Sequence, residues 1–247
     1  MQEMLKVPGG LALMSDRPEA MGKFFDRRSE SYDQHMRENL TDFEDFYRAV
    51  AQPIPKSERP LEILDLGCGT GLELQAVFER SPEARITAVD LSPGMLAELE
   101  RKYAVRSEQI EIICESYLEV ELSEARYDLA LSVMTMHHLL PDPKRTLYHK
   151  IFKSLKPGGL YIEGDYVVSQ ETSREMRSAY DELSEKHGAV GEGLYHLDLP
   201  LTLPIQKRLL LEAGFGAVRE HWKQAEAVVL SAEKDHPKHR SRRRLGS

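Results

Sequence analysis

The sequence is poor in features that mark several classes of protein. Its 247 residues include only two cysteines and one tryptophan, and no apolar run approaches the roughly 18 residues of a membrane-spanning helix. The first residues mix Gln2, Glu3 and Lys6 with proline and glycine, which does not fit the charged-then-apolar pattern of a secretion signal. We therefore expect no membrane span, no structural disulfide between Cys68 and Cys114, and a cytoplasmic location.

Positive charge is also scarce outside the C-terminus. The formal net charge is −8, and residues 236–247 hold five of the 33 basic side chains and no acid. Residues 1–235 therefore carry 28 basic against 41 acidic side chains, a poor surface for a large nucleic acid. We expect residues 236–247 to form a disordered basic tail, with a nucleic-acid arm as the alternative. Residues 1–20, which contain Pro8-Gly9-Gly10 and Pro18, are expected to be weakly ordered.

From residue 21 onward the sequence alternates between helix and strand patterns. Residues 21–37 and 41–51 have apolar residues at helical spacing, and the region 21–58 is interpreted as an N-terminal helical cap. Strands are predicted at 63–66, 85–90, 109–114, 127–133 and 160–167, with a closing hairpin of strands at 215–222 and 226–233. Helices are predicted at 71–80, from 92 onward, and at 143–155, 169–188 and 203–214. This alternation predicts a mainly parallel sheet with helices on both faces.

The most informative stretch is residues 61–71, where an apolar run ends in Asp65 and glycines follow at positions 67, 69 and 71. Glycine allows positive φ and lets a ligand lie against the backbone. A phosphate-binding loop would end in Gly-Lys-Ser/Thr, and a dinucleotide fingerprint would have its third glycine at position 72, which is Leu72. Asp65 and Glu73 instead suit a ligand that carries positive charge.

A second acid follows at the distance expected for ribose recognition. Asp90 ends a predicted strand nineteen residues after Gly71, where a carboxylate can accept hydrogen bonds from two ribose hydroxyls. The structural alternative is an Asp that caps the next helix, although Ser92 is already placed to fill that role.

The stretch Asp65-Leu66-Gly67-Cys68-Gly69-Thr70-Gly71 resembles the first motif of class I S-adenosylmethionine (SAM)-dependent methyltransferases. Residues 89–96 resemble the second motif of this family, residues 132–139 resemble its fourth, and Leu155-Lys156-Pro157-Gly158-Gly159 resembles its turn between helix and strand. The resemblance covers roughly residues 24–233. It implies a Rossmann-like doubly wound α/β sheet of seven strands, parallel except for the last, in a domain at residues 21–235 with a lid insert at 169–202.

The resemblance also implies a set of cofactor-binding residues. SAM would be the cofactor and S-adenosylhomocysteine (SAH) the product. These residues would form the glycine loop, bind the ribose, flank the adenine, meet its amino group and lie near the methionine part of SAM. In that order they would be Asp65, Gly67, Cys68, Gly69, Gly71, Asp90, Leu91, Met95, Glu115, Ser116, Val133 and Tyr32.

Catalytic and substrate residues are suggested less directly. His137 and His138 follow a strand and could accept a proton from the substrate, with a structural cap as the alternative for each. Arg28, Asp165 and Tyr195 are predicted substrate contacts, and Tyr180 and His196 could lie in the same pocket. Two adjacent histidines are expected to point in different directions, and no Cys/His/Asp cluster has zinc spacing, so we expect no metal site.

These observations favour transfer of a methyl group to a small-molecule acceptor by a monomer or homodimer. Three alternatives stay open: an RNA-modifying enzyme that uses SAM or a SAM derivative, a SAM-binding protein that only regulates a partner, and an NAD enzyme. The chain lacks the Asn/Asp-Pro-Pro-Tyr/Phe motif of enzymes that methylate adenine or glutamine nitrogens.

Overall fold

The computed structural model describes residues 19–187 and 195–236. The predictions for residues 1–18 and for most of the basic tail, 237–247, lie outside the described residues. No described helix is long and apolar enough to cross a membrane.

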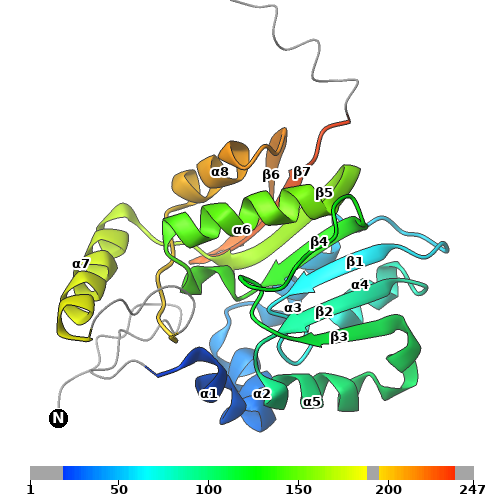
Figure 1. Ribbon diagram of the computed structural model, residues 1–247, viewed down its shortest axis with the longest axis horizontal. Coiled ribbons are helices and arrows are strands. Elements are labelled where there is room, and N and C mark those ends of the chain that lie inside the picture. The colour runs from blue at the N-terminus through cyan, green and yellow to red at the C-terminus, as the bar shows by residue number, and fades with distance from the viewer. Residues whose placement is uncertain (1–18, 188–194, 237–247) are drawn as a thin grey trace, which may run out of the picture.

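One seven-stranded sheet organises the molecule (Figure 1), in the order β3-β2-β1-β4-β5-β7-β6. Six strands run parallel, and β7 alone is antiparallel to its neighbours β5 and β6. The strands are β1 (Glu62–Leu66), β2 (Arg85–Asp90), β3 (Ile110–Cys114), β4 (Tyr127–Val133), β5 (Leu155–Tyr166), β6 (Ala217–Gln224) and β7 (Ala227–Glu233). The predicted fold class, with its antiparallel last strand, is therefore confirmed.

Helices cover both faces of the sheet. The α-helices are α1 (Met21–Asp26), α2 (Ser29–Asn39), α3 (Phe43–Ala51), α4 (Leu74–Arg80), α5 (Pro93–Lys102), α6 (Pro141–Ser154), α7 (Gln170–His187) and α8 (Leu203–Glu212). Two short 3-10 helices are η1 (Ala104–Gln109) and η2 (Met136–His138). In Figure 1, α6 and α8 lie on the near face, whereas α7 stands away from the sheet.

Two hydrophobic clusters explain why these elements pack as layers. On one face, Phe46, Val77 and Leu99 of α3, α4 and α5 pack with strand residues such as Ile63 and Leu131. On the other face, residues of α6 and α8 pack with the alternate strand residues, for example Leu64 and Ala130. Successive strand side chains point to opposite faces, so the nearly continuous apolar runs of β1 and β4 fill both clusters.

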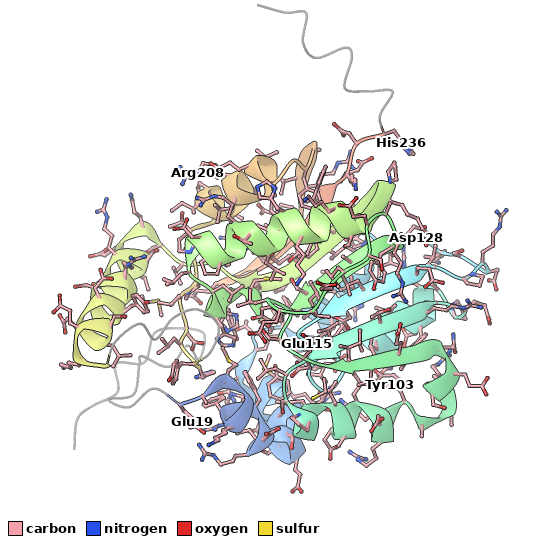
Figure 2. The ribbon with its side chains drawn as sticks, viewed as in Figure 1. Glu19, Tyr103, Glu115, Asp128, Arg208 and His236 are labelled. Carbon is pink, nitrogen blue, oxygen red and sulfur yellow. The ribbon has the colours of Figure 1, made fainter. Side chains whose placement is uncertain are left out.

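The segment predicted as a turn at residues 156–159 is instead the bulged start of β5. The structure includes these residues in β5, and the pairing register of β5 with β4 shifts between Tyr127 and Leu129. Gly158 has φ +81°, and its N–H donates to the Lys234 carbonyl at 2.7 Å. Asp128 has a structural role: it accepts from Lys156 Nζ at 2.8 Å at the end of the sheet away from Glu115 (Figure 2).

Candidate active site

The glycine loop joins β1 to α4 beside the point where the strand order reverses, which is where open α/β sheets bind ligands. Gly67, Gly69 and Gly71 all have positive φ, at 69°, 51° and 72°. A Cβ on Gly67 would overlap the side chain of Thr135, so the loop also packs against the segment after β4. A Cβ on Gly69 would meet no atom within 4 Å, which leaves bare backbone facing open space.

Asp90 lies against this loop at the end of β2. Its Oδ2 accepts from the Gly69 N–H at 2.9 Å, and its Oδ1 accepts from the Ser92 N–H at the same distance. Burial raises the pKa of Asp90 even though these backbone donors favour the carboxylate. Ser92 caps α5 as expected, because its side chain accepts from the Met95 N–H at 3.2 Å.

Two more acids, Asp65 and Glu73, are buried behind the loop. Neither oxygen of Asp65 has a hydrogen-bond donor among the described residues, and neither does Oε1 of Glu73. Burial, together with the charge of Glu73, raises the pKa of Asp65, and burial raises the pKa of Glu73. Unpartnered buried carboxyls are costly, and a cationic ligand group would remove that cost. The loop therefore fits a ligand with an ammonium or sulfonium, and a phosphate would be repelled.

A narrow cavity of about 30 Å³ opens beside the loop and Asp90. Such a volume holds about one water molecule, far less than a nucleoside-sized ligand needs. Helices α1 and α2 close the cavity, and Asp26 of α1 accepts from Ser92 Oγ at 2.6 Å and from the Gly94 N–H at 3.0 Å. The residues around the cavity are Met21, Phe25, Tyr32, Gly67, Gly69, Asp90, Leu91, Met95, Tyr117, Met134, Thr135 and His138.

Several predicted cofactor residues line this cavity and others do not. Tyr32, Leu91 and Met95 line it beside the glycines and Asp90. Glu115, expected at the adenine, is exposed.

The remaining predicted cofactor residues have local roles. Ser116 Oγ accepts from the Leu118 N–H at 3.2 Å. Val133 and Cys68 belong to the hydrophobic core, and the Gly71 carbonyl accepts from the Tyr103 hydroxyl at 2.7 Å. The side chains that line the cavity thus come one or two positions after the predicted Ser116 and Val133 in the chain.

Sequence reasoning missed Tyr117, Met134 and Thr135 as lining residues. Burial raises the pKa of Tyr117 to about 12, so its hydroxyl stays protonated. Met134 has φ +52°, a left-handed backbone conformation directly after β4. Met134 therefore lines the cavity in place of the predicted Val133. A left-handed non-glycine residue gives no reliable signal in the sequence.

Behind His138 lies a buried cluster of imidazoles and carboxylates. His137 Nδ1 is 2.5 Å from Asp165 Oδ1, and its Nε2 is 3.6 Å from Asp198 Oδ1. His138 Nδ1 is 3.3 Å from the same Asp198 oxygen, and the two adjacent rings have centroids only 4.0 Å apart. The expectation that these histidines point in different directions is therefore wrong, because the η2 turn directs both rings towards Asp198.

The charges of this cluster are unequal. Burial lowers the pKa of His137, but the nearby Asp165 and Asp198 carboxylates outweigh it and leave the pKa raised. Burial and the neighbouring His137 lower the pKa of His138, and burial lowers the pKa of His196 to about 3. The three imidazoles lower the pKa of Asp198 against the effect of burial.

The predicted substrate residues are not all brought together. Asp165 lies in the cluster and contacts His137. Arg28 is exposed, with its guanidinium carbon 3.6 Å from the centre of the Phe24 ring. Tyr195 forms an isolated β-bridge with Ala20 and packs near Tyr180, away from the cavity lining.

Comparison with known proteins agrees with this geometry. Residues 63–159 match the family model described as a methyltransferase domain. The chain is 34% identical over 128 residues to the malonyl-[acyl-carrier protein] O-methyltransferase of Priestia megaterium, covering 52% of this chain and 44% of that protein. It is 26% identical over 211 residues to the carboxy-S-adenosyl-L-methionine synthase of Shewanella loihica, covering 78% and 84%. The alignments span about half the length of the malonyl-[acyl-carrier protein] O-methyltransferases it matches.

Solved structures share the fold. Human N-acetylserotonin methyltransferase in complex with SAM matches with a TM-score of 0.61 and 19% identity, over 87% of this chain and 56% of that one. An O-methyltransferase family protein from Burkholderia thailandensis matches with a TM-score of 0.67 and 16% identity, over 91% and 66%. The match at residues 63–159 and the shared fold agree with the strand order and the acid-flanked glycine loop, so the chain contains a methyltransferase domain of this fold.

Proposed function

We propose that this protein transfers a methyl group from SAM to a small-molecule acceptor. The observation that carries the proposal is the pair of buried carboxyls, Asp65 and Glu73, behind a bare glycine backbone and beside Asp90. Both oxygens of Asp65 and Oε1 of Glu73 lack a basic or backbone donor among the described residues. This arrangement suits a nucleoside that carries positive charge and no phosphate.

The residues that would hold the cofactor follow from the lining of the cavity. Asp90 would bind the ribose hydroxyls, and Leu91 and Met95 would flank the adenine. Asp65 and Glu73 do not line the cavity but are buried behind the glycine loop, from where they would balance the ammonium. When bound, SAM supplies a methyl group on a sulfonium, which is already an excellent leaving group. The contribution of the chain is then to position the acceptor, and positioning can lower a barrier by several kcal/mol.

His138 is the imidazole that borders the cofactor cavity. We propose that it receives the proton that a hydroxyl or ammonium acceptor loses, with His137 and Asp165 behind it. Replacing His138 with Gln should lower kcat by about 10²-fold or more while the SAM affinity changes little. Radiolabelled methyl transfer across an acceptor panel measures kcat, and an unchanged kcat would exclude this role.

The cofactor assignment is tested by calorimetry on the full chain with SAM and SAH. We expect binding of both, and we expect Asp90→Ala to weaken it by at least about tenfold, since hydrogen bonds to a charged group contribute about 1.5–3 kcal/mol each. Asp128→Ala, at the opposite end of the sheet, is the matched control and should bind normally. Equal affinities for the two variants would refute the ribose assignment.

Synthesis of a carboxylated SAM is the second candidate, because the carboxy-S-adenosyl-L-methionine synthase of Shewanella loihica aligns over 84% of its length. A carboxylate at the methyl position would require a cationic partner. Among the described residues, those that line the cavity include no lysine or arginine, and Arg28 lies outside the cavity over Phe24. This lining favours methyl transfer.

We further propose a cytoplasmic location and acceptors other than nucleic acid. Cys68 and Cys114 are both free thiols, as a reducing compartment allows. The acidic surface outside residues 236–247 would repel a phosphate backbone.

A further inference from the structure

We propose that His137, His138 and Asp198 bind a divalent transition-metal ion. The ligand atoms would be His137 Nε2, His138 Nδ1 and Asp198 Oδ1. His196 Nε2, 3.9 Å from the same Asp198 oxygen, is a further imidazole nitrogen beside them. All three principal residues are buried, and their ligand atoms lie within 4.8 Å of one another.

The distances have the scale of a coordination polyhedron. Three imidazole nitrogens surround Asp198 Oδ1, with His138 at 3.3 Å, His137 at 3.6 Å and His196 at 3.9 Å. In a tetrahedral zinc site with bonds of about 2.0–2.1 Å, neighbouring ligand atoms are roughly 3.3 Å apart. Small side-chain movements would therefore bring these atoms to coordination distance.

Asp165 supports one ligand in the way that metal sites require. Its Oδ1 is 2.5 Å from His137 Nδ1, which fixes the ring tautomer and leaves Nε2 free to coordinate. The Tyr166 N–H also donates to Asp165 Oδ1, at 2.8 Å. Asp165 Oδ2 has no hydrogen-bond partner among the described residues. The Leu199 N–H donates to the His137 carbonyl at 2.7 Å, so the segment that carries Asp198 is anchored to the segment that carries the histidines.

The ligand types indicate which ion would bind. Two buried carboxylates, Asp165 and Asp198, face the imidazoles of His137 and His138. In the free protein His138 Nδ1 lies 3.1 Å from the Leu197 carbonyl and donates its proton there, and an ion would take the place of that proton. Imidazole with carboxylate suits Zn²⁺ and neighbouring transition metals, whereas Mg²⁺ prefers oxygen ligands alone.

The site also has a consequence for the reaction, and this consequence alone rests on the proposed function. His138 borders the cofactor cavity, so a bound ion would lie on the acceptor side of that cavity. There it would coordinate an acceptor oxygen and lower the pKa of its hydroxyl. In the metal-loaded chain His138 would hold the ion, so the proton-accepting role proposed above for His138 applies only to the metal-free chain.

The experiment measures metal binding without cofactor or acceptor. The full chain, freed of metal by a chelator, is titrated with Zn²⁺ against a chromophoric competitor, and Co²⁺ is used to report ligand geometry in visible absorption. We expect one tight ion per chain and the spectrum of a four- or five-coordinate site. Asp165→Asn should weaken binding about 10- to 100-fold, and His137→Gln and Asp198→Asn should weaken it further.

His149→Gln is the matched control, because His149 is an exposed histidine of α6 and should leave the affinity unchanged. If a ligand variant fails to fold, the wild-type chain still provides a test, since Zn²⁺ should raise its unfolding temperature reversibly and Mg²⁺ should not. No tight Zn²⁺ binding, or equal affinities in Asp198→Asn and wild type, would overturn the proposal. Failure of SAM to bind would instead overturn the proposed function and leave the metal result standing.

Discussion

At the scale of single residues, two glycines of the loop, Gly67 and Gly69, are required for different reasons. Gly67 and Gly69 share a left-handed backbone, which costs other residues about 1–2 kcal/mol. Only at Gly67 would a Cβ also overlap Thr135, whereas the space around Gly69 is open. The first is therefore needed for packing, and we propose that the second allows a ligand to approach the backbone.

This difference leads to a prediction for a matched pair of variants. Gly67→Ala should lower the free energy of unfolding by clearly more than the left-handed backbone strain of about 1–2 kcal/mol, because its Cβ would also overlap Thr135. Gly69→Ala should lose only about 1–2 kcal/mol but should bind SAM much more weakly, because its methyl would occupy the ligand's place. Urea unfolding and calorimetry measure the two quantities, and equal unfolding free energies would contradict the assignment.

The buried carboxyls predict how SAM affinity depends on pH. Burial and the charge of Glu73 raise the pKa of Asp65, so the free protein retains a proton there at low pH. A cationic ligand favours the ionised carboxyl, so binding must release that proton, and the affinity should rise with pH until the carboxyl is ionised in the free protein. Calorimetry from about pH 5 to pH 7.5, below the ordinary pKa of an α-amino group, measures this slope.

Asp65→Asn is the control for the pH dependence. It removes the titrating group and should leave SAM affinity lower and less dependent on pH. A wild-type affinity that falls as pH rises over this range would show that these carboxyls do not meet the cation.

At the scale of elements, α1 closes the cavity, and hydrogen bonds to Asp26 together with ring contacts of Phe24 and Phe25 with His196 hold it there. Asp26 accepts two hydrogen bonds from the N-terminal turn of α5, and Met21 and Phe25 line the cavity. The helix has six residues, too few to be stable without packing. Closure of α1 therefore depends on this junction.

We predict that Asp26→Ala loosens α1 selectively. Hydrogen exchange within residues 21–26 should become faster, and SAM should dissociate several-fold faster, while the unfolding midpoint changes little. Glu30→Ala, at an exposed position of α2, is the control. Unchanged exchange in α1 would mean that its apolar contacts alone hold it closed.

At the scale of the whole molecule, two clusters on opposite faces of one sheet should unfold together. Phe46 of α3 is fully buried and packs against Gly164 of β5. Phe46→Ala should reduce the free energy of unfolding by about 3–5 kcal/mol within a single transition. Val105→Ala, at a residue 95% exposed, should have almost no effect. Denaturant unfolding followed by two probes compares them, and separate transitions would show that the faces are independent.

Much of this molecule could be predicted from its sequence, because the relevant signals are local. Apolar runs and glycines placed the strands, the loop and Asp90, since each depends on residues close in the chain. The histidine cluster could not be predicted in this way. Asp198 lies sixty residues beyond His138 and meets it only through the packing of residues 195–202 over η2. The sequence also could not show that Met134, rather than Val133, lines the cavity, because this depends on one left-handed backbone conformation that many sequences could adopt.

The closure of the cofactor cavity by α1 has a kinetic consequence. A cavity with room for about one water molecule cannot exchange a nucleoside in this closed form, so we predict that each turnover includes displacement of α1. Slow escape of the spent nucleoside, rather than bond formation, would then set the pace of the enzyme, and its rate would decline as the solvent is made more viscous.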